Sequence, residues 1–159
     1  MALFLSTFEN KVDVKGRVSV PSQFRAMLYG NNFSGVVIYE SLINPCIEGC
    51  SIDRIQKLSE SIDDLDPFSK ERDAFATTVL GGSAQLAFDP DGRIILPKTL
   101  MLFAGIQDKA VFVGKGQTFE IWEPIAFTKR VFTARKEVKQ NNFNITSKTK
   151  HECKCNKTT

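Results

Sequence analysis

Residues 13–21 read Asp-Val-Lys-Gly-Arg-Val-Ser-Val-Pro, and residues 89–97 read Asp-Pro-Asp-Gly-Arg-Ile-Ile-Leu-Pro. Asp, Gly, Arg and Pro stand at the same four places in both stretches, which begin 76 residues apart. Apolar residues recur at matched places inside and after each stretch. Internal similarity at a fixed offset predicts that two tandem repeats organise the chain.

Each copy of this motif predicts a tight turn between two short strands. Valines alternate with polar residues on both sides of Lys15 and Gly16, as in half-buried strands. Gly16 and Gly92 suit a turn position with a positive φ. Asp13 and Asp89 can accept hydrogen bonds from backbone N–H groups of the same turns. These two aspartates and two glycines are therefore expected to be structural turn residues.

Similar segments follow each motif. A proline ends the motif and suits the first turn of a short helix. β-Rich runs come next, at 35–40 and 46–50 in the first half and at 110–114 and 118–122 in the second. Longer helical patterns begin at Ser51, at Asp66-Pro67 and at Glu123-Pro124. The expected parts are a first repeat (1–65), a linking helix (66–82), a second repeat (83–138) and a Lys-rich disordered tail (139–159).

A repeat of this size buries too little apolar surface to fold alone, so the two copies are expected to pack on each other. The predicted fold class is α+β, mainly β. Its expected architecture is one pseudo-symmetric barrel of interleaved hairpins with connecting helices.

The composition is that of an ordinary globular protein of 159 residues, with 42% hydrophobic and 25% charged residues. No uncharged apolar stretch approaches the length of a membrane span. The N-terminus has no basic residue before its short apolar start, unlike a signal peptide. These features predict a cytoplasmic protein without a membrane partner.

The net charge of +3 is unevenly distributed. Residues 136–159 contain six lysines and two glutamates, so the rest of the chain has a net charge of −1. Any contact with nucleic acid must therefore depend on a local basic cluster rather than on bulk charge.

Catalytic and metal sites find little support in the sequence. The single histidine, His151, lies in the tail, so the folded part offers no Ser–His or Cys–His pair. A hydrolase that uses Asp13 and Asp89 as a catalytic pair is another hypothesis. Such a pair shares a proton, whereas each of these aspartates has an arginine nearby that favours its ionised form. A zinc site remains an alternative with unusual ligand spacing; its ligands would be Cys46, Cys50, Cys153, Cys155 and His151. The prediction is no enzyme, no cofactor, no metal and no small-molecule substrate.

The pattern V-D-V-K-G-R-V-S-V-P-S-Q-F-R, repeated as F-D-P-D-G-R-I-I-L-P and followed by F-E-I-W-E-P, resembles the MraZ family of bacterial regulators. The resemblance covers roughly residues 1–135 and implies the AbrB-like swapped-hairpin fold. It implies a sequence-specific transcriptional regulator that binds short direct repeats in double-stranded DNA, at the promoter of a division and cell-wall gene cluster. It also implies a homo-oligomeric ring associated with the nucleoid.

The family's DNA contacts come from the loop that carries the motif, which corresponds here to Lys15, Arg17 and Arg93. The chain departs from the pattern at Asp91, which takes the place that Lys15 has in the first copy. The second loop is therefore expected to bind phosphate more weakly. A Lys-rich C-terminus with a Cys-x-Cys pair is a further departure from the family.

Two alternatives remain open at the level of sequence. Arg17 and Arg93 can instead form internal ion pairs with Asp13 and Asp89, and Lys15 can be an ordinary solvated turn residue. On that basis the alternative function is an oligomeric interaction or scaffold protein that keeps the same barrel but has lost DNA binding.

Overall fold

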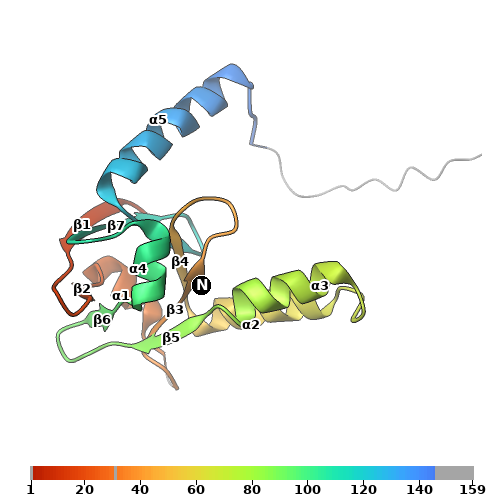
Figure 1. The fold of residues 1–159 in the computed structure, drawn as a ribbon, viewed down its shortest axis with the longest axis horizontal. Coiled ribbons are helices and arrows are strands. Elements are labelled where there is room, and N and C mark those ends of the chain that lie inside the picture. The colour runs from red at the N-terminus through yellow and green to blue at the C-terminus, as the bar shows by residue number, and fades with distance from the viewer. Residues whose placement is uncertain (1, 31, 146–159) are drawn as a thin grey trace, which may run out of the picture. The chain divides into compact units, whose positions relative to one another are not determined.

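Six strands form one antiparallel sheet, and two shorter strands form a second (Figure 1). The structure is a computed structural model that describes residues 2–30 and 32–145. The strands of the larger sheet are β1 (Thr7–Lys11), β3 (Gly35–Glu40), β4 (Ile47–Cys50), β5 (Ala84–Ala87), β7 (Lys109–Gly114) and β8 (Phe119–Trp122). The smaller sheet consists of β2 (Arg17–Ser19) and β6 (Arg93–Ile95). With its helices, the chain has a mixed α+β fold with open antiparallel sheets.

The helices follow the motifs and connect the two halves. Their bounds are α1 (Ser22–Leu28), α2 (Ile52–Asp63), α3 (Lys70–Phe75), α4 (Lys98–Ala104) and α5 (Pro124–Gln140), and a short π-helical turn, η1 (Ala76–Leu80), extends α3. α1 and α4 come directly after the two motifs. α2 and α3 form a hairpin that extends from the sheets on the right of Figure 1.

Strands from the two halves are intermixed in the larger sheet, whose order is β1-β7-β8-β4-β3-β5. β1 precedes the first motif but pairs with β7, and β5 precedes the second motif but pairs with β3. β4 and β8 join the halves in the middle of the sheet, and β2 pairs with β6. Neither half therefore forms a sheet of its own. Both sheets are open within the described part of the chain, so the closed barrel expected from the sequence stays a prediction.

A cluster of phenylalanines holds this arrangement together. Phe24 of α1 lies at its centre, with its ring centroid 5.2 Å from those of Phe4 and Phe119. Phe8 and Phe112 complete the contacts around the same ring. Because these five residues come from β1, α1, β7, β8 and the N-terminal segment, their packing joins both halves in one core. Edge-to-face contacts of this kind add to the stabilisation that burial of the rings provides.

Of the three longer helical patterns in the sequence, two begin where predicted. The Ser51 hydroxyl accepts a hydrogen bond from the backbone N–H of Arg54, which caps α2 as predicted. α5 begins at Pro124, also as predicted, and its first N–H groups donate to the Glu123 carboxylate. The second helix does not begin at Asp66-Pro67. Asp66 instead accepts a hydrogen bond from the N–H of Phe68 in a turn, and Ser69 caps α3.

The chain divides into two compact units, Met1–Phe127 and Thr128–Thr159. In the second unit, α5 continues to Gln140, with an ion pair of 3.1 Å between Arg130 and Glu137. The ammonium group of Lys136 lies 4.3 Å from the ring centroid of Phe132. Most of the predicted Lys-rich tail, 146–159, lies outside the described residues. Among those that are described, no helix has the length and apolar character to cross a membrane.

Candidate nucleic-acid interface

The two motif turns are tied together by the small β2–β6 ribbon. Its register places Arg17 opposite Ile95 and Ser19 opposite Arg93. The Gly16 carbonyl accepts a hydrogen bond from the N–H of Leu96 at 2.9 Å, and the Gly92 carbonyl accepts one from Val20 at 3.2 Å. Each turn is therefore held in place by the backbone of the other motif.

Both turns have the same backbone geometry. The N–H of Gly16 donates to the Asp13 carbonyl and the N–H of Gly92 to the Asp89 carbonyl, each at 3.0 Å. The φ angle is +84° at Gly16 and +74° at Gly92, in the region that favours glycine. A Cβ atom on Gly16 would also lie 3.0 Å from the carbonyl oxygen of Leu96. The turn therefore depends on glycine for both its backbone angle and its close packing.

The two aspartate carboxylates organise the turns and orient the arginines. Asp13 Oδ1 accepts hydrogen bonds from the backbone N–H groups of Arg17 and Lys15, at 2.8 and 3.0 Å. Asp13 Oδ2 accepts one from Nε of Arg17 at 2.7 Å. Asp89 makes the same three kinds of bond in the second turn, including one of 2.8 Å from Nε of Arg93.

These contacts stabilise both carboxylates in the ionised form. The hydrogen bond from the Arg17 backbone is the main reason why the pKa of Asp13 lies below its usual value. The Arg93 backbone lowers the pKa of Asp89 in the same way. Both groups are therefore charged at neutral pH, as an anchor for arginine requires.

The two arginines differ in what their outer nitrogens contact. The side chain of Arg17 is 37% exposed, and neither of its Nη atoms has a hydrogen-bond partner among the described residues. Nη2 of Arg93 donates to Asp91 at 3.2 Å, in addition to the bond from Nε to Asp89. The first turn therefore presents a freer guanidinium group than the second.

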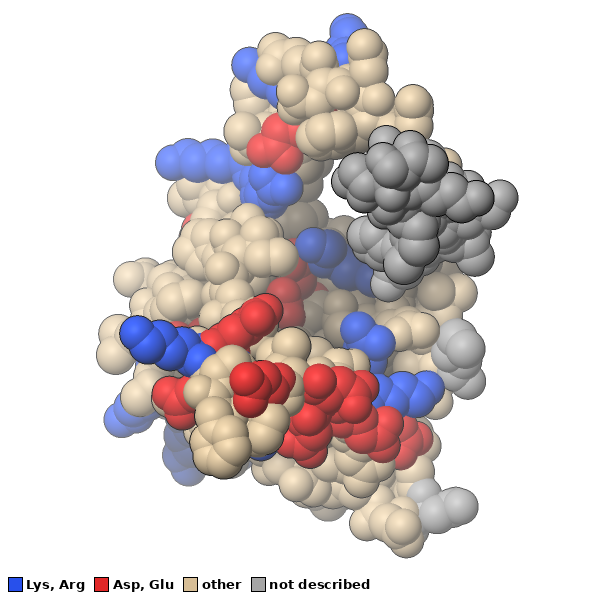
Figure 2. Space-filling model, turned by 90° about the vertical axis from the view of Figure 1, so that its right-hand side faces the viewer, with Lys and Arg blue, Asp and Glu red and all other residues tan. Residues whose placement is uncertain are grey.

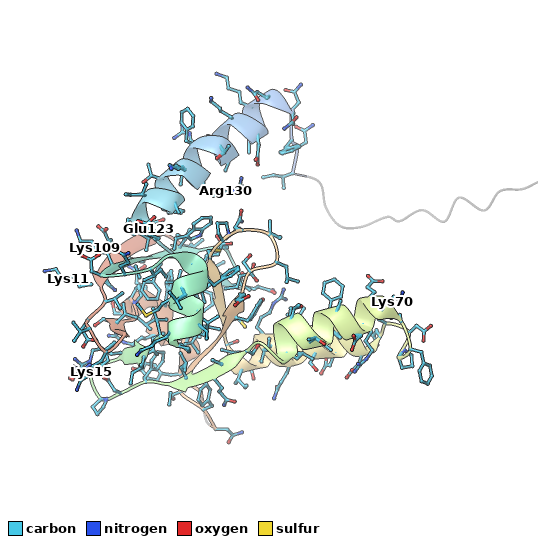
Figure 3. All side chains as sticks on the ribbon, viewed as in Figure 1. Lys11, Lys15, Lys70, Lys109, Glu123 and Arg130 are labelled. Carbon is cyan, nitrogen blue, oxygen red and sulfur yellow. The ribbon has the colours of Figure 1, made fainter. Side chains whose placement is uncertain are left out.

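The edge of the larger sheet adds two lysines that sequence analysis did not select. Lys11 of β1 lies directly opposite Lys109 of β7 in the sheet register, and both are exposed. In the view of Figure 3, Lys11, Lys109 and Lys15 lie along one edge of the first unit. Only the pairing of β1 with β7 brings Lys11 and Lys109 together, so no local sequence signal could have identified the pair.

Charge of the opposite sign gathers elsewhere in the first unit. Figure 2 shows Asp and Glu side chains on the face that the α2–α3 hairpin presents. The exposed acidic residues at this end of the hairpin are Glu60, Asp63, Asp64, Asp66, Glu71 and Asp73, which we call the acidic tip. Two basic residues, Lys70 and Arg72, do not balance them. This part of the surface would repel a phosphate backbone.

An apolar groove of about 360 Å³ lies between the hairpin and the loop that joins β3 to β4. Its apolar lining includes Leu42, Ile43, Leu58, Leu65, Phe75 and Val79. Ile43 is 84% exposed. The groove contains no histidine or lysine and only two carboxylates, Glu48 and Glu71, so its chemistry is that of apolar packing.

The described residues contain no group of three or more His, Cys, Asp or Glu side chains that could hold a metal ion. Cys46 and Cys50 are buried thiols, and burial raises the pKa of both, that of Cys50 to about 12. Thiols of this kind are poor nucleophiles. The other ligands of the zinc alternative, Cys153, Cys155 and His151, lie outside the described residues.

Comparison with known proteins matches this chain to one family. Residues 79–150 match the family model described as "MraZ protein, putative antitoxin-like". A "Transcriptional regulator MraZ" of Rickettsia akari is 50% identical over 145 residues, 91% of this chain and 97% of the relative. Proteins of the same name from Pelagibacter ubique and Rickettsia rickettsii are 52% and 53% identical, over 90% and 86% of this chain and 92% and 91% of their own lengths. With similarity of this degree along nearly its whole length, the chain belongs to the MraZ family.

Proposed function

We propose that the chain is a sequence-specific DNA-binding transcriptional regulator, and that the two motif turns are its contact points. The names of its relatives support a role in transcription. The observation that carries the proposal is the pair of turns, held on one β2–β6 ribbon, from which Arg17 extends a partly exposed guanidinium group. A planar group with free Nη donors is suited to bind phosphate or to read guanine O6 and N7.

In this proposal Lys15, Arg17 and Arg93 contact DNA, and Asp13, Gly16, Asp89 and Gly92 shape the turns. Lys11 and Lys109 add contacts to the phosphate backbone. Two lysines held directly opposite each other on neighbouring strands repel one another. A bound polyanion would relieve this repulsion, which supports an anionic partner at this edge.

The proposed architecture is two tandem AbrB-like repeats, 1–65 and 83–138, in one swapped-hairpin barrel, with 66–82 as the link and 139–159 as a basic tail. The crossed pairing of β1 with β7 and of β5 with β3 supports exchange of hairpins between the repeats. Such a molecule offers only two small turns to DNA, which is too few for the affinity of a typical operator. We therefore propose that many copies form a ring, so that several turns engage successive direct repeats.

The proposed target is the promoter of a division and cell-wall gene cluster, read through short direct repeats. The test is footprinting of the purified full chain on the DNA upstream of its own gene. We expect protection of several short repeats at a regular spacing, and no protection with Arg17→Ala at the same concentration. Uniform weak coverage of all sequences by both proteins would contradict sequence-specific binding.

A scaffold protein without DNA binding is the second candidate, and the ion pairs of Arg17 with Asp13 and of Arg93 with Asp89 favour it. If these pairs serve only the fold, removal of either partner lowers stability and leaves no DNA-specific defect. A gel shift with upstream DNA separates the two functions, because the scaffold forms no complex that survives competition by random duplex.

A further inference from the structure

Arg25 of α1 lies against the turn of the second motif, 67 residues away in sequence. A Cβ atom placed on Gly92 would lie 2.6 Å from Nε and 2.7 Å from Cζ of Arg25. The guanidinium plane therefore covers the bare Cα of Gly92. Nη1 of Arg25 donates to the carbonyl oxygen of Val20, which fixes the side chain in this position.

The corresponding place in the first turn is filled by an uncharged residue. Met101 occupies in α4 the position that Arg25 occupies in α1, four residues after the proline of its motif. Its Sδ atom is 3.5 Å from the Cβ position of Gly16. Each helix thus supports the turn of the other motif, α4 with a thioether and α1 with a cation.

The cation beside the second turn offsets the more negative charge of that turn. The first turn contains Asp13, Lys15 and Arg17, whereas the second contains Asp89, Asp91 and Arg93 and is net negative by itself. Arg93 is already bonded to both aspartates of its turn. Arg25 makes no ion pair with any described residue, so no carboxylate among them neutralises its charge.

We infer that Arg25 is a phosphate-binding residue of the second turn, in the role that Lys15 has in the first. The inference rests on the proposed DNA-binding function. An arginine has five N–H donors, and the bond to Val20 uses one of them. Gly92 has no side chain to obstruct the remaining donors. They can therefore reach a DNA phosphate bound beside the second turn.

The test compares Arg25→Met, which places at this position the residue found at 101, with Arg25→Lys, which keeps the charge. Binding of the full chain to upstream duplex DNA is measured at several salt concentrations, together with the melting temperature. We expect Arg25→Met to fold and to bind both operator and random duplex about 10-fold more weakly. The slope of log K against log salt concentration should decrease in magnitude by about one for each second turn that contacts DNA. Arg25→Lys should restore most of the slope.

Met101→Ala is the matched control, because it removes the equivalent support without removing charge. Its salt slope should equal that of the unchanged protein. A salt slope in Arg25→Met equal to that of the unchanged protein would overturn the inference. So would equal losses of DNA affinity in Arg25→Met and Arg25→Lys that are matched by equal falls in melting temperature. Failure of the proposed function would look different, because the unchanged protein and Arg17→Ala would then bind DNA alike.

Discussion

Nε of Arg17 donates to Oδ2 of Asp13 at 2.7 Å, while both Nη atoms of Arg17 remain without a hydrogen-bond partner among the described residues. One Arg17 side chain can therefore make the internal ion pair through Nε and still contact DNA through its Nη atoms. The two interpretations of the sequence do not exclude each other. Asp13 holds the guanidinium by one edge and leaves the other edge toward solvent. The same arrangement limits the stabilisation that the pair provides, because water screens an ion pair at the exposed surface.

Arg17→Ala tests this division of roles. We expect loss of specific binding to upstream DNA with the oligomer intact, because every copy in a ring would lose a base or phosphate contact at once. Arg93→Ala should weaken binding less, since Asp91 already occupies one of its Nη atoms. Operator affinity, melting temperature and mass by light scattering are measured for both. A stable Arg17→Ala oligomer with normal operator affinity would refute the assignment.

Asp13→Ala completes that comparison. It removes the acceptor of two backbone N–H groups as well as the partner of Arg17, so we expect a lower melting temperature together with weaker DNA binding. If Arg17→Ala and Asp13→Ala lower the melting temperature equally and both disturb assembly, the ion pair serves the fold, as the scaffold function requires.

Acid should destabilise the protein through Asp13 and Asp89. Their pKa values in the folded chain lie below the ordinary 3.8, so their stabilising effect is present above that pH and is lost as the pH falls through the lowered folded pKa. Asp13→Asn with Asp89→Asn should therefore have a lower melting temperature at pH 7. In thermal melts followed by circular dichroism, the difference from the unchanged protein should shrink as the pH falls below 3.8. A difference that stays constant with pH would contradict this role of the carboxylates.

Gly16→Ala should destabilise the chain more than Gly105→Ala. Both glycines have positive φ angles, +84° and +67°, so both substitutions place alanine in a left-handed conformation at a cost of about 1–2 kcal/mol. A Cβ on Gly105 meets nothing within 4 Å, whereas one on Gly16 lies 3.0 Å from the Leu96 carbonyl oxygen. Urea unfolding measures both losses. Equal losses would mean that the β2–β6 ribbon yields to the added methyl group.

Ile43→Glu should reduce self-association without unfolding the first unit. Ile43 and Leu42 are largely exposed beside the apolar groove, and exposed apolar groups of this kind are typical of contacts between protein copies. Light scattering of the unchanged chain should give the mass of a ring of many copies, and that of the variant a smaller mass. Gln107→Glu is the charge control, because it also adds one carboxylate, on another exposed loop. An unchanged protein that is monomeric at micromolar concentration would contradict the ring.

Deletion of residues 139–159 should weaken binding to all DNA sequences alike. This segment is rich in lysine, and lysines that contact only phosphates contribute release of counterions without reading bases. The ratio of operator to random-duplex affinity should therefore be unchanged in competition gel shifts. A truncated chain that lost its preference for the operator would show the segment to be a recognition element.

The sequence by itself determined the local features of the chain. The two Asp-x-x-Gly-Arg turns, the Ser51 cap and the start of α5 at Pro124 depend on contacts within a few residues, which the side chains specify wherever the segment lies. The start of α3 was predicted too early, because Asp66-Pro67 and Ser69 both suit a helix start, and the structure uses Asp66 for a turn instead.

Only the tertiary structure decided which distant residues share a surface. Crossed pairing of β1 with β7 sets Lys11 beside Lys109, and the exchange of helices between turns lays Arg25 on Gly92. Neither contact has a local signature, because an exposed lysine on a strand or an arginine on a short helix looks the same whatever lies across from it. Burial of the phenylalanine cluster around Phe24 selects the pairing that joins the two halves, and the charges on the surface follow from that choice.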